Sequence, residues 1–432
     1  MNTYETGEIV EGFELPAGTW MIRSAQPKGR LALALFERST HVEDHDTYDI
    51  TAWCMPVSFG ADCFYTNNNA SLQTRTLSTF TTSNPAATTI TEANPAIAID
   101  SAQHHFPVAM GLATKHGIFC RFADDTFVVD GTRFERGSLI AHRTRNEPSA
   151  MSAFLADVAM HGLRAHAAST TMTSEGPVLG ADSNGVVDNP RVLLLRGSPM
   201  SALSFGQHWH LMDIESPIPH AVVNADRFGS IDLDEYNVLV VPDAFGLGTV
   251  MNSSTRDDLK DWVRSGGAIV ASGASARWIT RNILEIESSD DDEDDQDKED
   301  DEKNSDLGFD ERYDKSVVNR VSGALLRADI DTTHPMTGGV RKWLGVIKRG
   351  RSTLDVGENG YVVARFAQVE ELIIGGAISE ENADKIAGTP FVTHHRLGRG
   401  NVVCFAEDIT MRGFNHAAMR LLLNAITLGP SL

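Results

Sequence analysis

The chain has 432 residues, of which 41% are hydrophobic and 22% charged, and its formal net charge is −22. This length accommodates two or three domains, and the composition is typical of a soluble globular protein. So large a negative charge repels nucleic-acid phosphates and anionic lipid, so we expect neither nucleic acid nor a membrane as a partner. The start of the sequence lacks the basic and apolar regions of a signal peptide. It predicts a cytoplasmic protein, or a secreted or periplasmic one if the sequence is a fragment of a longer precursor.

The first part of the chain, residues 1–65, is predicted to be a β-rich segment because its residues alternate like those of strands. Within it, residues 31–36 are apolar enough for either a short helix or a strand. Residues 66–95 are rich in Thr, Ser, Asn and Pro. That composition predicts a polar linker or a long surface loop.

Residues 96–170 are predicted to form a small α/β domain. Apolar positions at helical spacing indicate two helices, at about 101–115 and 149–162. Short apolar runs indicate strands at 96–100, 117–122, 126–129, 138–141 and 163–168. The polar residues from 170 to 190 are punctuated by Gly and Pro, so they are expected to mark a domain boundary.

The remainder, residues 186–432, is predicted to be a second α/β domain with a doubly wound parallel sheet. Its first strand, 191–195, is a continuous apolar run of the kind that parallel sheets bury on both faces. Helices are expected at 201–212 and at 254–265, the latter with Ser254 as its N-cap. Further strands are expected at 221–224, 236–242, 267–272, 362–366, 372–374, 391–394 and 401–405, before a closing helix at 414–426.

An acidic insertion, at about 286–312, is expected to interrupt this second domain. Residues 290–302 are almost entirely Asp and Glu, which indicates a solvated, disordered surface segment. A calcium-binding loop is the alternative, but the run has neither the central glycine nor the spaced ligands of an EF-hand. The four cysteines, Cys54, Cys63, Cys120 and Cys404, form no C-x-x-C pair, so we expect reduced and mostly buried thiols.

The order of elements from 190 to 278 resembles a class I glutamine-amidotransferase-like domain, a flavodoxin-like fold. Residues 397–415 and 420–425 are similar to the end of the bacterial M14-like zinc carboxypeptidases that carry such a domain behind the peptidase domain. Shorter segments resemble the same group: Ala-Gln-Pro-Lys-Gly-Arg at 25–30, Tyr-Asp-Ile-Thr-Ala-Trp at 48–53, Phe-Gly-Gln-His-Trp-His at 205–210 and Asp-Thr-Thr-His-Pro at 331–335.

The resemblance implies an M14 peptidase domain, which this chain does not contain. The zinc site of that domain needs His-x-x-Glu and a distal His, yet no histidine here is followed by Glu three residues later. His41 and His210 have Asp44 and Asp213 at that spacing, which we interpret as accidental. Neither a nucleotide-binding loop nor another cofactor motif is present, so we expect no metal and no cofactor.

In active members of the amidotransferase fold, the nucleophile is a cysteine in a strained strand-to-helix turn, Gly-x-Cys-x-Gly. The matching segment here is Ser-Gly-Ala-Ser-Ala-Arg at 272–277, which places Ser275 at the nucleophile position and Arg277 where the second glycine would be. A serine nucleophile also needs a base, and the late histidines are His394, His395 and His416. Because His394 and His395 lead into a glycine turn, we expect them on a surface loop, and we expect Ser275 to be structural.

The segment 205–210 holds the other candidate ligand-binding residues, His208 and His210. At i and i+2 on a helix they point in different directions, which makes them poor joint ligands. Either could line the crevice at the carboxyl ends of the strands, together with Ser275 and Arg277. The alternative, which the pattern favours, is that Trp209 packs against a neighbouring helix and His210 is buried and hydrogen-bonded.

Three functions remain open from the sequence. The first is a non-catalytic accessory region that acts with a separate M14 peptidase domain or as a homo-oligomer. The second is a hydrolase that uses Ser275, and the third is a module that binds a small molecule or carbohydrate at the strand ends. The missing cysteine and the missing His-x-x-Glu favour the first.

Overall fold

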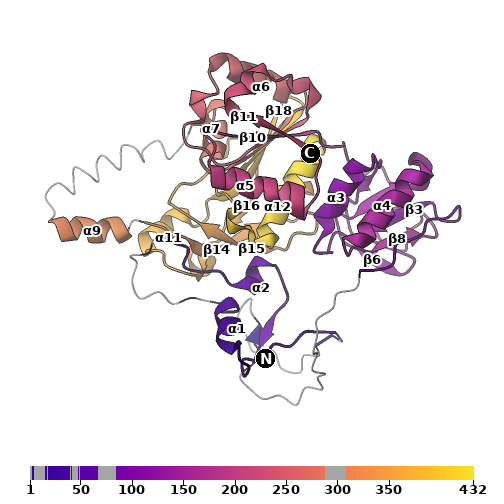
Figure 1. Cartoon of the computed structure of the whole chain (residues 1–432), viewed down its shortest axis with the longest axis horizontal. Coiled ribbons are helices and arrows are strands. Elements are labelled where there is room, and N and C mark those ends of the chain that lie inside the picture. Colours follow the sequence, from indigo (N-terminus) through magenta and orange to yellow (C-terminus); the bar gives the residue numbers. More distant parts are fainter. Residues whose placement is uncertain are drawn as a thin grey trace.

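The computed structural model describes residues 2–3, 15–16, 18–38, 40, 47, 49–66, 84–287, 308–318 and 320–432. Figure 1 shows a large sheet domain in the centre, a small domain of earlier residues on the right and the N-terminal segment below. Residues 67–83 of the predicted linker and 288–307 of the predicted acidic insertion lie outside the described residues.

The large domain is built on a ten-stranded sheet, half of which is parallel. The parallel strands are β11 (His220–Asn224), β10 (Val192–Arg196), β12 (Val238–Val241), β13 (Ala268–Ser272) and β19 (Gly400–Phe405), in that spatial order. Numbered by their sequence among these five, they lie in the order 2-1-3-4-5, the doubly wound order of flavodoxin. The parallel α/β sheet predicted from the apolar runs is therefore confirmed for this half.

The other half of the sheet is antiparallel, which the sequence analysis did not predict. It continues from β19 through β18 (Pro390–Leu397), β16 (Gly360–Phe366), β14 (Ala324–Ile330) and β15 (Trp343–Lys348), and β17 (Ile373–Gly375) also pairs with β14. The reversal begins at a tight hairpin, because Leu397 pairs with Gly400 and Gly398 between them has a φ of 65°. A two-residue connection with a left-handed glycine forces neighbouring strands to run in opposite directions.

Helices flank the sheet, and Figure 1 shows α5 (Ala202–His210) and α12 (His416–Leu428) in front of it. The helix α6 (Ser253–Arg264) is capped by Asn252, whose side chain accepts from Thr255 N, so the predicted cap at Ser254 is wrong. None of the helices in the described ranges is long and apolar enough to cross a membrane. Other α-helices among the described residues of this domain are α7 (Gly273–Asn282), α9 (Phe309–Val318), α10 (Val369–Leu372) and α11 (Glu380–Ile386).

The small domain has a five-stranded antiparallel sheet that carries α3 (Phe106–Lys115) and α4 (Pro148–Met160). The sheet order is β8 (Ala165–Ala168), β3 (Ala96–Ile99), β7 (Leu139–His142), β4 (Arg121–Phe122) and β9 (Gly185–Val186), with a separate hairpin of β5 (Phe127–Val129) and β6 (Thr132–Phe134). The predicted end at residue 170 is too early. Because β9 pairs with β4, the segment after 170 completes this domain instead of linking it to the next.

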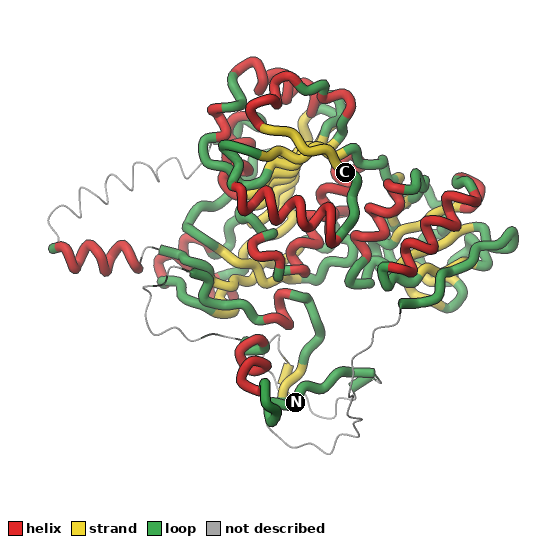
Figure 2. Tube along the Cα trace, viewed as in Figure 1, coloured by secondary structure: helices red, strands yellow, loops and turns green. Residues whose placement is uncertain are grey.

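The described part of the N-terminal segment does not have the β-rich character predicted for residues 1–65. Its described part contains two helices, α1 (Gly29–Leu35) and α2 (Met55–Ser58), and two-residue strands β1 (Asn2–Thr3) and β2 (Phe64–Tyr65) (Figure 2). Alternating Leu and Ala in α1 imitate a strand pattern, but both residues are strong helix formers. Val57 of α2 packs into a hydrophobic cluster with Leu325 and Ile347, which anchors the segment on β14 and β15.

Two arginines join the small domain to the large one. Arg420 of α12 is buried, and its Nη1 donates to Gln103 O (3.1 Å) while its Nη2 donates to Ser101 O. From the other side, Arg136 donates to the carbonyl groups of residues 332–334, in the loop that follows β14. Between these contacts the backbones touch, because a Cβ on Gly338 would lie 2.8 Å from the Cα of Gly137. The two domains therefore meet as closely as two glycines allow.

Replacing Gly338 with alanine should separate this contact and lower the free energy of unfolding by about 1–3 kcal/mol, the usual cost of overpacking a closed interface. The obstacle is backbone on both sides, which cannot turn away as a flexible side chain would. Urea denaturation of the full chain measures the effect. Gly206→Ala on α5 is the matched control, because its new methyl group meets nothing within 4 Å. Equal stability of the two variants would contradict the expectation.

Candidate functional site

The carboxyl ends of the parallel strands gather polar side chains at one edge of the sheet. Asp243 follows β12, Gly273 follows β13, and Glu407 and Asp408 follow β19. Strand ends at the reversal of a doubly wound sheet are the usual place for a ligand or an active site. This edge is the candidate site.

The strand-to-helix turn after β13 has its left-handed residue at Gly273, where φ is 61°. A side chain at this tip has no room, because a Cβ there would lie 2.3 Å from Asp243 Oδ1. That carboxylate oxygen accepts a hydrogen bond from Ala274 N (2.8 Å), at the start of α7. Asp243 therefore occupies the amide-lined position at a helix N-terminus where an anion would otherwise bind.

Ser275, the residue predicted at the nucleophile position, lies two residues beyond the tip and within α7. Its side chain is fully buried, and its hydroxyl donates to Pro242 O at 2.7 Å. A nucleophile elbow presents its side chain from the strained residue itself, above the sheet. The structure thus assigns the tip to Gly273 and gives Ser275 the hydrogen bond of a structural residue, so the predicted register of the elbow is wrong by two residues.

The protonation of Asp243 is set by its surroundings. Burial raises the pKa of its carboxyl group, although the hydrogen bond from Ala274 N opposes the shift. The negative charge of Asp408 raises the pKa further, whereas the charges of Arg277 and His208 lower it. An acid at the strand ends is thus held partly out of water, facing a second carboxylate.

His208, a predicted candidate, lies at this edge and is buried. Its Nδ1 is 2.9 Å from Ser204 O and 3.3 Å from Thr410 Oγ1, and Asp408 Oδ1 is 4.0 Å away. Within the described part of the chain its Nε2 is buried and has no hydrogen-bond partner. Because Nδ1 faces a backbone carbonyl of its own helix, it carries the ring proton in the neutral form.

His210 and Trp209 do not have the packing that was predicted for them. The side chain of His210 is 53% exposed, and its Nδ1 pairs with Glu215 Oε1 at 3.2 Å. Trp209 is itself 39% exposed, so the buried histidine of the segment is His208. The other oxygen of Glu215 lies 3.8 Å from His416 Nδ1. As expected for positions i and i+2, the two histidines of α5 face different surroundings.

The late histidines are also placed differently from the prediction. His394 and His395 lie inside β18 and are both only 4% exposed, not on a surface loop. The pattern is misleading because the hairpin turn starts at Gly398, three residues later. Neither imidazole hydrogen-bonds to Ser275, whose hydroxyl donates to Pro242 O.

A buried ion pair closes one side of the candidate site. Lys348 Nζ at the end of β15 contacts Glu407 Oε1 and also donates to Ser352 O at 2.7 Å. Arg349 N donates to the second carboxylate oxygen at 3.3 Å. Burial raises the pKa of Glu407, and the charges of Lys348 and Arg277 oppose this. The sequence does not predict this pair, since its members are 59 residues apart, one at the last position of β15 and the other just after β19.

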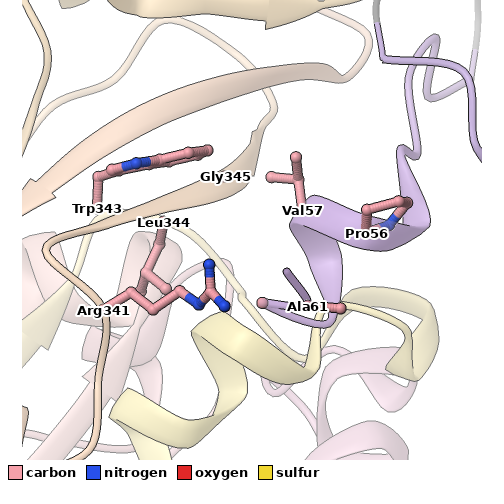
Figure 3. A pocket seen from close by; sticks show the side chains of 8 residues that line it. Pro56, Val57, Ala61, Arg341, Trp343, Leu344 and Gly345 are labelled. Carbon is pink, nitrogen blue, oxygen red and sulfur yellow. The ribbon is translucent and has the colours of Figure 1, made fainter. Parts of the chain in front are cut away.

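Two small hollows are found among the described residues. One, of about 320 Å³, lies between α2 and β15, where the Arg341 side chain extends between Trp343 and Ala61 (Figure 3). It contains none of the candidate residues. The other, of about 200 Å³, is lined by Arg277 and Arg281 on consecutive turns of α7, with Thr280, Ile286, Thr353, Leu354 and Asp355. Arg277, one of the predicted ligand-binding residues, therefore lines this hollow.

No thiol is available at the elbow. Cys404 is buried within β19 and Cys120 in the small domain, and burial raises the pKa of both thiols to about 12. In the ranges that the structure describes, no three His, Cys, Asp or Glu side chains are grouped so that they could hold a metal ion. Among the described residues, the site therefore positions carboxylates, an imidazole and hydrogen bonds, and the two thiols named above are buried.

No known family profile and no curated protein sequence matches the chain. Among solved structures, it is similar to the cytoplasmic protein STM3548 of Salmonella typhimurium, with 12% identity over 54% of this chain and 97% of that one and a TM-score of 0.31. A ThuA-like protein of Parabacteroides merdae matches with 12% identity, 56% and 90% coverage and a TM-score of 0.31. A β-galactosidase of Bacillus circulans sp. alkalophilus matches with 14% identity, 65% and 35% coverage and a TM-score of 0.28. Likenesses of this size assign neither a family nor an activity.

Proposed function

We propose that this chain is a non-catalytic accessory region whose amidotransferase-like domain acts with a zinc carboxypeptidase domain carried on a separate chain. The observation that supports the non-catalytic role is the elbow itself. Its tip is Gly273, and the carboxylate of Asp243 fills the place of a reacting group. The identity of the partner rests on the sequence resemblance of the tail and of the segments at 25–30, 48–53, 205–210 and 331–335.

An elbow whose Ala274 N–H already donates to a carboxylate is unsuited to acyl transfer. The oxyanion that forms in such a reaction needs backbone N–H donors, and the bound carboxylate repels a second negative charge. Ser275 cannot substitute, because its hydroxyl is buried and donates to Pro242 O. These features support a role in holding or orienting a partner. Such a role requires a stable fold and a surface that binds the partner, but no nucleophile.

The test uses the purified full chain, alone and with a separately purified M14-type zinc carboxypeptidase domain. Alone, the chain should bind no stoichiometric zinc, by metal analysis, and should release no C-terminal residue from peptides. Mixed with the peptidase domain, it should form a complex by size-exclusion chromatography and change that domain's kcat/KM. Chelator-sensitive peptide hydrolysis by the chain alone would refute the non-catalytic role. If the peptidase domain forms no complex with the chain and its kcat/KM does not change, the partnership is refuted.

The hollow beside Arg277 supports a second candidate, a module that binds a small anionic molecule. Two guanidinium groups on consecutive helical turns suit a carboxylate or phosphate, although Asp355 in the same lining limits the net positive charge. A thermal-shift panel of small acids and sugar phosphates tests this. An Arg277→Met variant should lose any stabilisation that the wild type shows, and a flat response from the wild type would exclude this function.

A further inference from the structure

Two buried histidines are joined in a chain of hydrogen bonds: His334 belongs to the loop 331–340, here called the clasp loop, and His394 to β18 beneath it. His334 Nε2 and His394 Nδ1 are 2.9 Å apart, and His394 Nε2 lies 2.9 Å from Asn401 Oδ1. At the other end, Met336 N donates to His334 Nδ1 at 3.2 Å. The chain therefore runs from a backbone amide, through two imidazoles, to a side-chain amide.

The partners at both ends fix which ring nitrogens carry protons. A backbone N–H can only donate, so His334 Nδ1 accepts and the ring proton sits on Nε2. Asn401 Nδ2 donates to Gly429 O at 3.0 Å, so its Oδ1 faces His394 as an acceptor, and His394 Nε2 carries the proton. With one proton on each ring, His334 Nε2 donates to His394 Nδ1. Every position along the chain is then matched, and a further proton has no acceptor.

The outer side of the clasp loop holds the small domain. Arg136 donates to the carbonyl groups of Thr332 and Thr333 and, at 3.3 Å, to that of His334. Asp331 supports the same turn, because its Oδ1 accepts from Thr333 N at 2.9 Å. The Asp-Thr-Thr-His-Pro segment thus presents three carbonyls outward to Arg136, with the histidine chain beneath them.

We propose that the clasp loop is an acid-sensitive latch, in which protonation of the His334–His394 pair releases Arg136 and with it one of the two arginine contacts that hold the small domain. An added proton on His334 Nδ1 would face Met336 N–H, and one on His394 Nδ1 would face His334 Nε2–H. Either breaks the hydrogen-bond chain that shapes the loop. The carbonyls that bind Arg136 belong to the same turn as His334. When the turn changes shape, these carbonyls no longer point at the guanidinium group, and the hydrogen bonds to Arg136 are lost.

The groups around the pair do little to stabilise a positive charge. His394 on β18 faces His334 from one side, Tyr361 on β16 stacks on His394 and lies tilted against His334, and Arg136 approaches from the small domain. His395, next to His394 on β18, adds a further imidazole near His394. Arg396 adds a further positive charge near His394, whereas Asp331 contributes the opposing negative charge. Burial lowers the pKa of His334 to about 4, the neighbouring His394 adds to this shift, and burial also lowers the pKa of His394.

The sign of the pH dependence follows from these shifts. An imidazole with a lowered pKa in the closed state stabilises that state fully above its ordinary pKa of 6.5. The stabilisation is lost progressively as the pH falls from 6.5 toward about 4. Release of His334 alone should therefore raise the open fraction by roughly thirtyfold between about pH 7.5 and about pH 5, if the freed ring regains its ordinary pKa.

Hydrogen–deuterium exchange of the full chain, corrected for the intrinsic effect of pH, tests the latch. Peptides covering 331–340 and 132–138 should lose about thirtyfold in protection at about pH 5, while peptides of β12 and β13 keep theirs. In a His334→Asn variant the loss should shrink severalfold, because the Asn oxygen can still accept from Met336 N and does not titrate. An unchanged acid response in this variant would overturn the proposal.

Other histidines lie near the same domain contact and provide the matched control. His104 also has a pKa lowered to about 4 by burial, and its ring lies 5.7 Å from that of His416. A His104→Asn variant should keep the acid response; its loss there would assign the effect to this second cluster and overturn the latch. If His334→Asn does not fold, NMR titration of the wild-type imidazoles decides. A His334 ring that becomes charged while 331–340 stays protected contradicts the proposal.

Discussion

Replacing Lys348 with methionine should lower the free energy of unfolding by about 3–5 kcal/mol, because it leaves the Glu407 carboxylate buried without its cation. Lys348 is fully buried, and its ammonium group contacts Glu407 Oε1. The remaining donor of that carboxylate, Arg349 N at 3.3 Å, cannot compensate for a lost charge. Urea denaturation measures the change, as a lower midpoint with an unchanged slope.

The deficit of Lys348→Met should depend on pH in a defined direction. Without Lys348 the pKa of Glu407 rises further above its ordinary value of 4.5, so the folded variant binds a proton that the unfolded chain has released. Stability is then lost as the pH rises, and the deficit should be larger at about pH 8 than at about pH 5. A deficit that does not change with pH would contradict this account.

Two further variants separate the buried charge from general damage. In Lys348→Met/Glu407→Leu both charges are absent, and most of the lost stability should return, since a buried pair contributes little over apolar residues of similar volume. Lys260→Met removes the cation of the pair with Glu285, whose side chain is 73% exposed. That control should cost no more than about 1 kcal/mol. A loss in the control as large as that of Lys348→Met would mean that burial is not the cause.

The same pair shows why half of the fold could not be predicted. Lys348 ends β15 and Glu407 follows β19, and in the sheet these strands are separated by β18, β16 and β14. A contact between residues of two strands that are not neighbours depends on the three-dimensional course of the whole antiparallel half. No local sequence pattern predicts that course. By contrast, β10, β12 and β13 are short continuous apolar runs between helices. Such runs identify buried parallel strands directly, and their order follows the doubly wound rule.

The histidines of β18 illustrate a second limit. Polar residues before a glycine turn are typical of an exposed loop, yet His394 and His395 are buried. His394 is tolerated because His334 and Asn401 satisfy both of its nitrogens, from a loop and a strand far apart in the sequence. Burial of a polar side chain is decided by its partners. The sequence therefore predicts where the strand ends, but not the residues that hydrogen-bond to its buried imidazole.

The sequence motif predicts the tip of the elbow two residues too late. The difference matters because Ser275 at the tip would be a nucleophile, whereas Gly273 has no side chain. The Gly-x-Cys-x-Gly motif fits the sequence with Gly273 as its first glycine and Ser275 at the cysteine position, which is the tip. The backbone puts the left-handed residue first, at Gly273, and Ser275 then falls inside the helix. Register at a tight turn depends on φ, and a glycine next to other small residues leaves several registers open.

Gly273→Ala should lower the free energy of unfolding by about 2–4 kcal/mol, because a left-handed backbone and a steric conflict act at one position. The new methyl group would lie 2.3 Å from Asp243 Oδ1 and 2.8 Å from its Cγ. The carboxylate must then leave Ala274 N, which loses its hydrogen bond at the start of α7. Thermal and urea denaturation of the variant measure the loss.

Gly117→Ala isolates the backbone part of this cost. Gly117 has a φ of 62°, against 61° at Gly273, and a Cβ there meets nothing within 4 Å. It should cost only about 1 kcal/mol. Asp243→Ala in the Gly273→Ala background removes the conflicting oxygen, so the double variant should be more stable than the sum of the single changes predicts, by about 1–2 kcal/mol. Strict additivity would mean that Asp243 does not fill the tip of the elbow, and the main support for a non-catalytic role would be lost.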